Sequence, residues 1–133
     1  MSGQSGVATK GYWLKSGEGE TISFVGERAR VLADAATTGG RCFIFEETTP
    51  AGVGPPLHRH GIDDEFFYIL EGRFRFVMDG REFIAEPGAF LSVPKGSVHT
   101  FVNVGAGPGL EEGRMRGFRQ LLPAVAGQTA AIG

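Results

Sequence analysis

The chain has 133 residues, which is enough for one well-buried core and too few for two ordinary domains. Its 13 Lys and Arg residues are interspersed with 15 Asp and Glu residues, so no positive field exists to hold a polyanion and we expect no nucleic-acid partner. A single cysteine, Cys42, the lack of a signal-peptide pattern and the lack of an apolar run of about 18 residues predict a cytoplasmic protein without a membrane span.

The middle of the chain consists of short apolar runs separated by glycines and prolines. The 22 glycines are well above the usual share of about 7%. Short runs rich in Phe, Val and Ile and bounded by turn residues are typical of antiparallel sandwiches and barrels. Asp79-Gly80, between two such runs, is a strong signal for a two-residue hairpin. We therefore predict an all-β domain over residues 19–109, with strands at 21–25, 29–34, 41–47, 65–70, 73–78, 81–85, 90–93 and 99–104.

The two ends of the chain do not share this pattern. Residues 1–18 are expected to form a loosely held N-terminal arm. After the stretch "GAGPG" at 105–109, apolar residues recur at roughly helical spacing, namely Leu110, Met115, Phe118, Leu122 and Val125. The sequence therefore predicts a short C-terminal helix over 110–126, followed by a flexible tail over 127–133.

Two of the three histidines stand one residue apart in the stretch "PPLHRHGIDDEFF" at 55–67. Side chains two apart in a strand point to the same face, so His58 and His60 form a potential chelating pair. Glu65 follows at an odd spacing, but the intervening "GIDD" contains turn-forming residues that bend the chain and reset the phase. We assign Asp63 and Asp64 to this turn rather than to the metal. His99 opens another predicted strand and can reach the same point from a neighbouring strand.

Three imidazoles and one carboxylate suit one divalent transition metal ion (Fe, Mn, Ni, Co, Cu or Zn) and not Ca²⁺ or Mg²⁺. Such a set leaves coordination positions open for substrate, water or dioxygen, which is typical of catalytic rather than structural sites. We therefore predict His58, His60, Glu65 and His99 as metal ligands. The alternative is a pocket that keeps these residues without a metal.

The same residues lie in two patterns that resemble the motifs of the cupin family. The first motif is met by Gly52, His58, His60, Glu65 and Gly72. The second motif is met by Gly88, Pro94, Gly96, His99 and Asn103. The resemblance implies a cupin barrel, that is, a double-stranded β-helix or jelly roll. The residues themselves predict tight turns at Gly72 and Gly96 and a role for Asn103 in bonding the backbone of a loop.

The chain looks most similar to small single-domain cupins of the quercetin dioxygenase type. This resemblance implies a metal-dependent dioxygenase in which Glu65 also acts as a general base. Strand alternation places Phe67, Ile69 and Phe101 on the metal's face, which predicts a pocket for a small aromatic or apolar, flavonol-like substrate. The alternative is a non-catalytic cupin module that binds or senses a small molecule.

The sequence departs from the family pattern after the second motif. A cupin normally returns there as a further apolar strand, whereas "NVGAGPGLEEGRMRGF" at 103–118 passes almost directly to helix-like sequence. The barrel would then have an unpaired edge, which requires a cover. On this ground we predict a homodimer, in which a partner subunit, the arm or the helix covers the edge.

Overall fold

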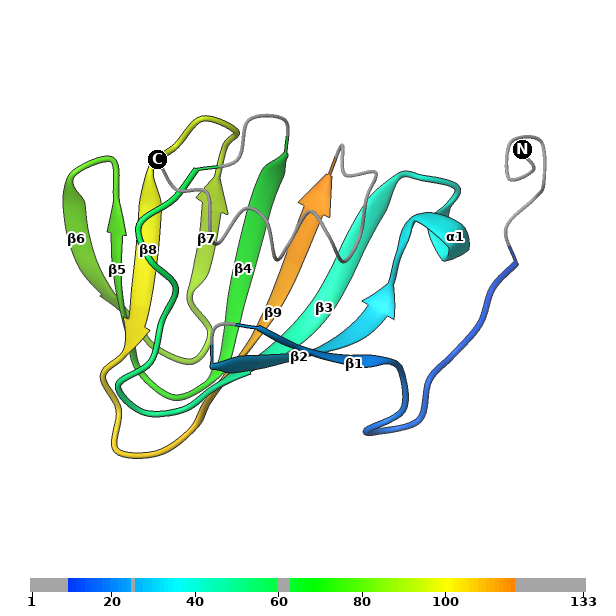
Figure 1. The fold of residues 1–133 in the computed structure, drawn as a ribbon, viewed down its shortest axis with the longest axis horizontal. Coiled ribbons are helices and arrows are strands. Elements are labelled where there is room, and N and C mark those ends of the chain that lie inside the picture. Colours follow the sequence, from blue (N-terminus) through cyan, green and yellow to red (C-terminus); the bar gives the residue numbers. More distant parts are fainter. Residues whose placement is uncertain (1–9, 25, 60–62, 117–133) are drawn as a thin grey trace.

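The computed structural model describes residues 10–24, 26–59 and 63–116 and folds them into two antiparallel sheets (Figure 1). The strands are β1 (Thr21–Phe24), β2 (Glu27–Ala33), β3 (Cys42–Thr49), β4 (Asp64–Glu71), β5 (Phe74–Met78), β6 (Arg81–Ala85), β7 (Phe90–Val93), β8 (His99–Asn103) and β9 (Gly109–Arg116). One sheet has the strand order β1-β2-β3-β9-β4-β7 and the other the order β6-β5-β8. A one-turn helix, α1 (Ala35–Thr38), connects β2 to β3.

All the predicted strands are confirmed, with ends that shift by at most two residues within the part of the chain that the structure describes. The predicted hairpin is confirmed as well, because Asp79 and Gly80 join β5 to β6 with φ angles of 49° and 82°. Positive φ at both central positions matches the twist of the adjoining strands. The architecture is the expected jelly-roll barrel of a cupin.

The predicted C-terminal helix is wrong over residues 110–116. These residues belong to β9, which pairs with β3 along one side and with β4 along the other. The further strand that the sequence seemed to lack is therefore present in the middle of the larger sheet, and the unpaired edge expected there does not exist. The rest of the predicted helix and the tail at 127–133 lie outside the described residues.

The sequence of β9 predicts a helix instead of a strand because the inward positions of this strand are not apolar. Burial alternates along the strand with a period of two, and the residues that face inward are Gly109, Glu111 and Gly113. A Cβ on Gly113 would lie 2.3 Å from Cζ of Phe45, and one on Gly109 would lie 2.4 Å from Cζ of Phe74. The ring of Phe45, on the adjacent strand β3, and the ring of Phe74, on β5 of the facing sheet, fill this space, so only glycine fits at these two positions. A hydrophobic pattern therefore cannot reveal this strand.

The apolar core lies between the two sheets, where β4 and β7 face β5, β6 and β8. It comprises Phe67, Ile69, Phe74, Phe76, Ala85, Leu91, Val93 and Phe101. The rings of Phe76 and Phe101 have centroids 5.1 Å apart, and Phe67 contacts both at 5.7 Å. Within the described ranges, no helix is long and apolar enough to cross a membrane.

Candidate metal centre

The backbone holds His58 and His99 side by side. His58 lies before β4 and forms an isolated antiparallel bridge with His99, the first residue of β8. The N–H of His58 donates to the carbonyl of His99 at 2.9 Å, and the N–H of His99 donates to the carbonyl of His58 at 2.7 Å. Directly paired residues project to the same face of a sheet. The two imidazole centroids are 4.2 Å apart as a result.

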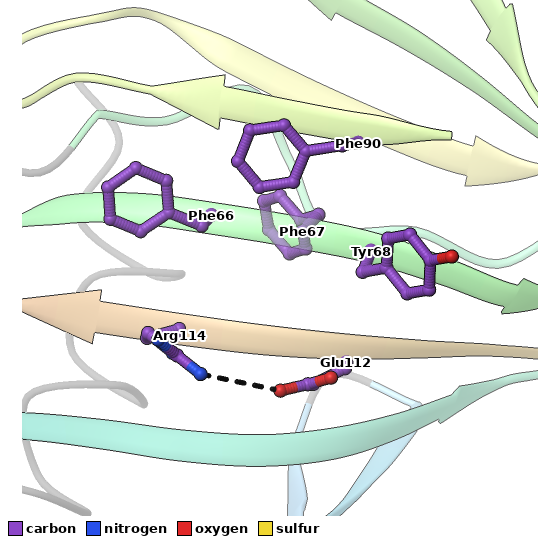
Figure 2. Close-up of a pocket in the computed structure, with 6 residues that line it drawn as sticks. All are labelled: Phe66, Phe67, Tyr68, Phe90, Glu112 and Arg114. Atoms are coloured by element: carbon purple, nitrogen blue, oxygen red, sulfur yellow. Dashed lines mark ion pairs between the residues drawn. The ribbon is translucent and has the colours of Figure 1, made fainter. Parts of the chain in front are cut away.

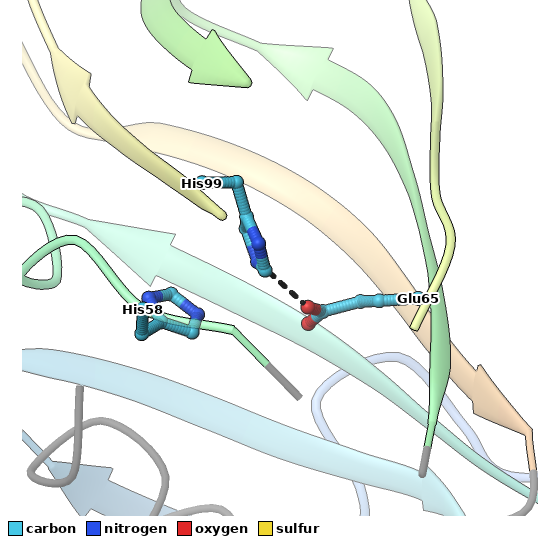
Figure 3. A group of neighbouring side chains, drawn as sticks. All are labelled: His58, Glu65 and His99. Atoms are coloured by element: carbon cyan, nitrogen blue, oxygen red, sulfur yellow. Dashed lines mark hydrogen bonds and ion pairs between the residues drawn. The ribbon is translucent and has the colours of Figure 1, made fainter. Parts of the chain in front are cut away.

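Glu65 reaches the two imidazoles from β4. Its Oε1 lies 3.2 Å from Nε2 of His99, and the ligand atoms of His58, Glu65 and His99 all lie within 4.8 Å of one another (Figure 3). The three side chains are 5%, 4% and 0% exposed. Three of the four predicted ligands are thus brought together inside the barrel. The fourth, His60, lies outside the described residues.

The hydrogen bonds of the two imidazoles are compatible with metal coordination through their Nε2 atoms. Nδ1 of His58 lies 2.8 Å from the carbonyl oxygen of Pro56, and Nδ1 of His99 lies 3.0 Å from that of Ser97. A carbonyl oxygen only accepts, so each Nδ1 carries the hydrogen and, in the neutral ring, each Nε2 keeps its lone pair. Nε2 of His99 faces a carboxylate oxygen of Glu65 at 3.2 Å, a contact that a proton on Nε2 or a metal ion bound by both atoms would satisfy. Metal-binding histidines are commonly oriented by such a bond from the other ring nitrogen.

Asp63 and Asp64, which lie shortly after His60 in the sequence, have different surroundings. Asp64 is the first residue of β4 rather than a turn residue, and it accepts a hydrogen bond from the backbone N–H of Lys95 at 3.1 Å. Asp63 is 1% exposed, so its carboxyl group is buried. Neither belongs to the group of ligand atoms formed by the described residues.

Asn103 shapes the loop that leads into β9. Its Nδ2 donates to the carbonyl oxygens of Thr49 and Gly107 at 2.8 and 2.9 Å, and its Oδ1 accepts from the N–H of Gly105 at 2.8 Å. The expectation that Asn103 bonds backbone groups around a loop is confirmed. This loop turns the chain directly into β9, which is why no longer connection is needed.

The inner wall of the barrel is only partly apolar. The phenylalanines expected beside the metal belong to the core, but Glu27, Glu47 and Glu111 line the opposite wall and are buried. Burial, reinforced by the charge of Glu47, raises the pKa of Glu27 to about 10. Burial and neighbouring carboxylates also raise the pKa values of Glu47 and Glu111 well above the ordinary range. Alternation along β2 and β3 could have indicated the first two, but Glu111 was hidden in the misread strand.

A separate hollow lies on the outer face of the larger sheet. It has a volume of about 450 Å³ and is lined by Phe66, Phe67, Tyr68, Phe90, Glu112 and Arg114 (Figure 2). The rings of Phe66 and Phe90 stack there with centroids 6.1 Å apart. Because none of the three clustered ligands lines it, this hollow is a surface feature rather than part of the candidate metal centre.

Comparisons with known proteins agree with the fold. The sequence model of the cupin domain family matches residues 45–110. Quercetin 2,3-dioxygenase of Bacillus subtilis is 34% identical over 90 residues, which is 68% of this chain but only 27% of that enzyme.

Solved structures give the same architecture. KdgF from a Halomonas species superposes with a TM-score of 0.74 at 17% identity, covering 84% of this chain and 97% of that one. A predicted oxalate decarboxylase from Thermotoga maritima gives 0.73 at 21% identity, covering 80% and 100%. With its jelly-roll fold, its two motifs and the family match, the chain belongs to the cupin superfamily.

Proposed function

We propose that this protein is a metal-dependent oxidoreductase of the dioxygenase type that acts on a small aromatic or apolar molecule. The observation that carries the proposal is the convergence of His58, Glu65 and His99 on one buried point. Imidazole and carboxylate ligands suit a first-row transition metal ion. His60, as the expected fourth ligand, completes the set.

The similarity to quercetin 2,3-dioxygenase supports the reaction class. It extends over 68% of this chain, although it spans about a quarter of the enzyme's own length. The aromatic wall formed by Phe67, Phe76 and Phe101 supports the class of substrate, since flat apolar molecules pack well against such rings.

The protein's own residues have distinct parts in the proposed reaction. When bound, the metal ion would supply Lewis acidity, which makes a hydroxyl group of the substrate easier to deprotonate. The two histidines hold the ion, with their Nδ1 hydrogens fixed on backbone carbonyls. Glu65 accepts the proton of the substrate hydroxyl at a carboxylate oxygen, as a general base. The buried surroundings exclude water from this transfer.

Oxygen uptake with a panel of flavonols and catechols tests the proposal. Purified protein loaded in turn with Fe, Mn, Co, Ni, Cu or Zn should consume dioxygen with at least one substrate and one metal. Glu65→Gln should lower kcat by about 10²- to 10⁴-fold, the range for loss of a general base. Glu86→Gln, at an exposed ion pair with Arg73, is the matched control and should leave kcat unchanged.

A non-catalytic binding module gives a different result in the same assay. Stoichiometric metal without dioxygen uptake on any member of the panel, combined with tight binding of one of them, would establish that alternative. A barrel wall lost after the second motif would favour that alternative, but β9 forms this wall by pairing with β3 and β4.

We also propose a homodimer, on a new ground. The outer hollow exposes Phe90 and Tyr68 by 63% and 43%, and it carries Glu112 and Arg114 with charged atoms 3.9 Å apart. A two-fold axis through this face would bury the aromatic rings and pair each charge with its opposite in a second copy. Light scattering at micromolar concentration should give twice the chain mass. Phe90→Lys should give monomers, whereas the control Ile84→Lys, exposed on the smaller sheet, should not.

A further inference from the structure

The three glutamates of the acidic wall form a continuous row across adjacent strands. Glu27 lies on β2, Glu47 on β3 and Glu111 on β9, and these strands are neighbours in the larger sheet (Figure 1). Glu47 stands directly opposite Glu111 in the register of β3 and β9. On its other side the carboxyl group of Glu47 interacts with that of Glu27. Glu47 is therefore the central member of the row.

No basic side chain that the structure describes balances the charge of the row. In the described part of the chain the arginines that form ion pairs contact Glu46, Glu82, Glu86 and Glu112, and none contacts the row. The three side chains are 3%, 3% and 0% exposed, so water does not solvate them either. Like charges placed opposite each other on neighbouring strands repel, and buried charges are normally paired or bound to a metal ion.

Buried oxygen atoms that lack a hydrogen-bond partner outside the row are a second indication that a cation binds there. Apart from the neighbouring carboxyl group, both carboxylate oxygens of Glu111 are buried without a hydrogen-bond partner, and so is Oε2 of Glu27. The hydroxyl oxygen of Thr49, which is 0% exposed, lies beside Glu27 and has no hydrogen-bond partner apart from that carboxyl group. A neutral hydroxyl in this position adds a ligand atom without adding charge.

We propose that the row Glu27, Glu47 and Glu111, with Thr49, binds a hard divalent cation of the Ca²⁺, Mg²⁺ or Mn²⁺ class at a second site. Every donor is an oxygen atom, which these ions prefer, whereas the histidine-containing centre favours first-row transition metals. Among the described residues only His58, Glu65 and His99 have three such ligand atoms within 4.8 Å of one another, so the glutamate row is wider than one coordination shell. Binding therefore centres on Glu47 and draws the outer carboxylates inward.

Calcium is the diagnostic probe because it does not suit the histidine-containing centre. Full-length protein whose first centre carries its transition metal is titrated with Ca²⁺ by calorimetry, with Tb³⁺ luminescence as a second readout. The wild type should bind one equivalent and unfold at a higher temperature. Glu47→Gln should weaken Ca²⁺ binding at least tenfold and abolish the thermal shift. The control Glu46→Gln, one residue from Glu47 but facing away from the row and paired with Arg30, should behave as the wild type.

Any other result of this titration would contradict the proposed second cation site. If the wild type binds no Ca²⁺, Mg²⁺ or Mn²⁺ beyond the first centre, and Glu47→Gln is more stable at alkaline pH, protons alone neutralise the row. If Ca²⁺ binds equally well to Glu47→Gln, it binds elsewhere. Should Glu47→Gln fail to fold, as circular dichroism would reveal, Glu27→Gln takes its place. In His58→Ala the transition metal should be lost while Ca²⁺ binding persists, which separates this site from the proposed activity.

Discussion

The hydroxyl of Ser97 donates a hydrogen bond of 2.7 Å to Oδ2 of Asp79 and thereby ties the hairpin between β5 and β6 to the segment that carries His99. Oδ1 of the same aspartate accepts from the N–H of Val98 at 3.0 Å, and the Ser97 hydrogen bond lowers the pKa of Asp79. Since the carbonyl of Ser97 also anchors the imidazole of His99, the hairpin positions a proposed metal ligand without belonging to the candidate metal centre.

Ser97→Ala should therefore weaken metal binding without removing a ligand. Loss of such a supporting contact typically costs about 10- to 100-fold in affinity. Competition with a chromophoric chelator measures the change. Ser92→Ala, at an exposed position of β7, is the control and should bind metal like the wild type. Equal affinities for the two variants would show that the hairpin does not orient His99.

Replacing the clustered histidines should abolish the metal centre. His58→Ala or His99→Ala leaves too few donors for a first-row ion, and we expect bound metal to fall below about one tenth of an equivalent by elemental analysis. Arg59→Ala is the matched control, because Arg59 is adjacent to His58 in sequence but exposed. Full metal content in both histidine variants would contradict the assigned ligands.

Gly113→Ala should destabilise the barrel at β9. The added Cβ would lie 2.3 Å from the ring of Phe45, and overpacking of this kind costs about 1–3 kcal/mol. Urea unfolding should show the loss, and Phe45→Leu should partly restore stability in the double variant by freeing space. Gly107→Ala, with open space around its Cα, should be nearly neutral. An unchanged unfolding midpoint for Gly113→Ala would be inconsistent with the close packing of these two strands.

Asn103→Ala should destabilise the fold through the loop before β9. It leaves the buried carbonyl of Thr49 and the partly buried carbonyl of Gly107 without their side-chain donor. A buried group left unsatisfied costs about 1–3 kcal/mol, so we expect a total loss of about 3 kcal/mol in urea unfolding. Val104→Ala, at the next and exposed position, should change stability much less. Equal stabilities for the two variants would contradict the role given to Asn103.

The raised pKa of Glu27 predicts that stability falls with rising pH. In the unfolded chain this carboxyl group loses its proton near pH 4.5, but in the folded protein it keeps the proton up to about pH 10. The folded state then binds more protons than the unfolded state, so the free energy of unfolding decreases through this window. By pH 7 the decrease due to Glu27 is about 3 kcal/mol in the absence of a bound cation.

Glu27→Gln should remove the part of this pH dependence that is due to Glu27, because the amide has no proton to lose. Urea unfolding in a chelating buffer from about pH 5 to about pH 8 should give a flatter profile than the wild type. Glu46→Gln, whose carboxyl group is paired with Arg30 outside the barrel, should retain the wild-type slope. Identical slopes for Glu27→Gln and the wild type would show that Glu27 is ionised in the folded protein.

The sequence by itself determined the β architecture, the family and most of the metal centre. Strands such as β6 and β7 were predictable because their apolar residues alternate between turns, and Asp79-Gly80 marked its hairpin because few residues adopt positive φ. The grouping of His58, Glu65 and His99 into one candidate site was predictable because their spacing and chemical type are informative before any packing is known.

Only the tertiary structure decided the course of β9 and the nature of the opposite wall. Residues 110–116 read as a helix because their inward positions hold a glycine and a glutamate rather than apolar residues, and the reason for the glycine is the ring of Phe45 on another strand. The row of Glu27, Glu47 and Glu111 likewise exists only once β2, β3 and β9 lie side by side. Contacts between distant segments are set by strand pairing, which local sequence patterns do not encode.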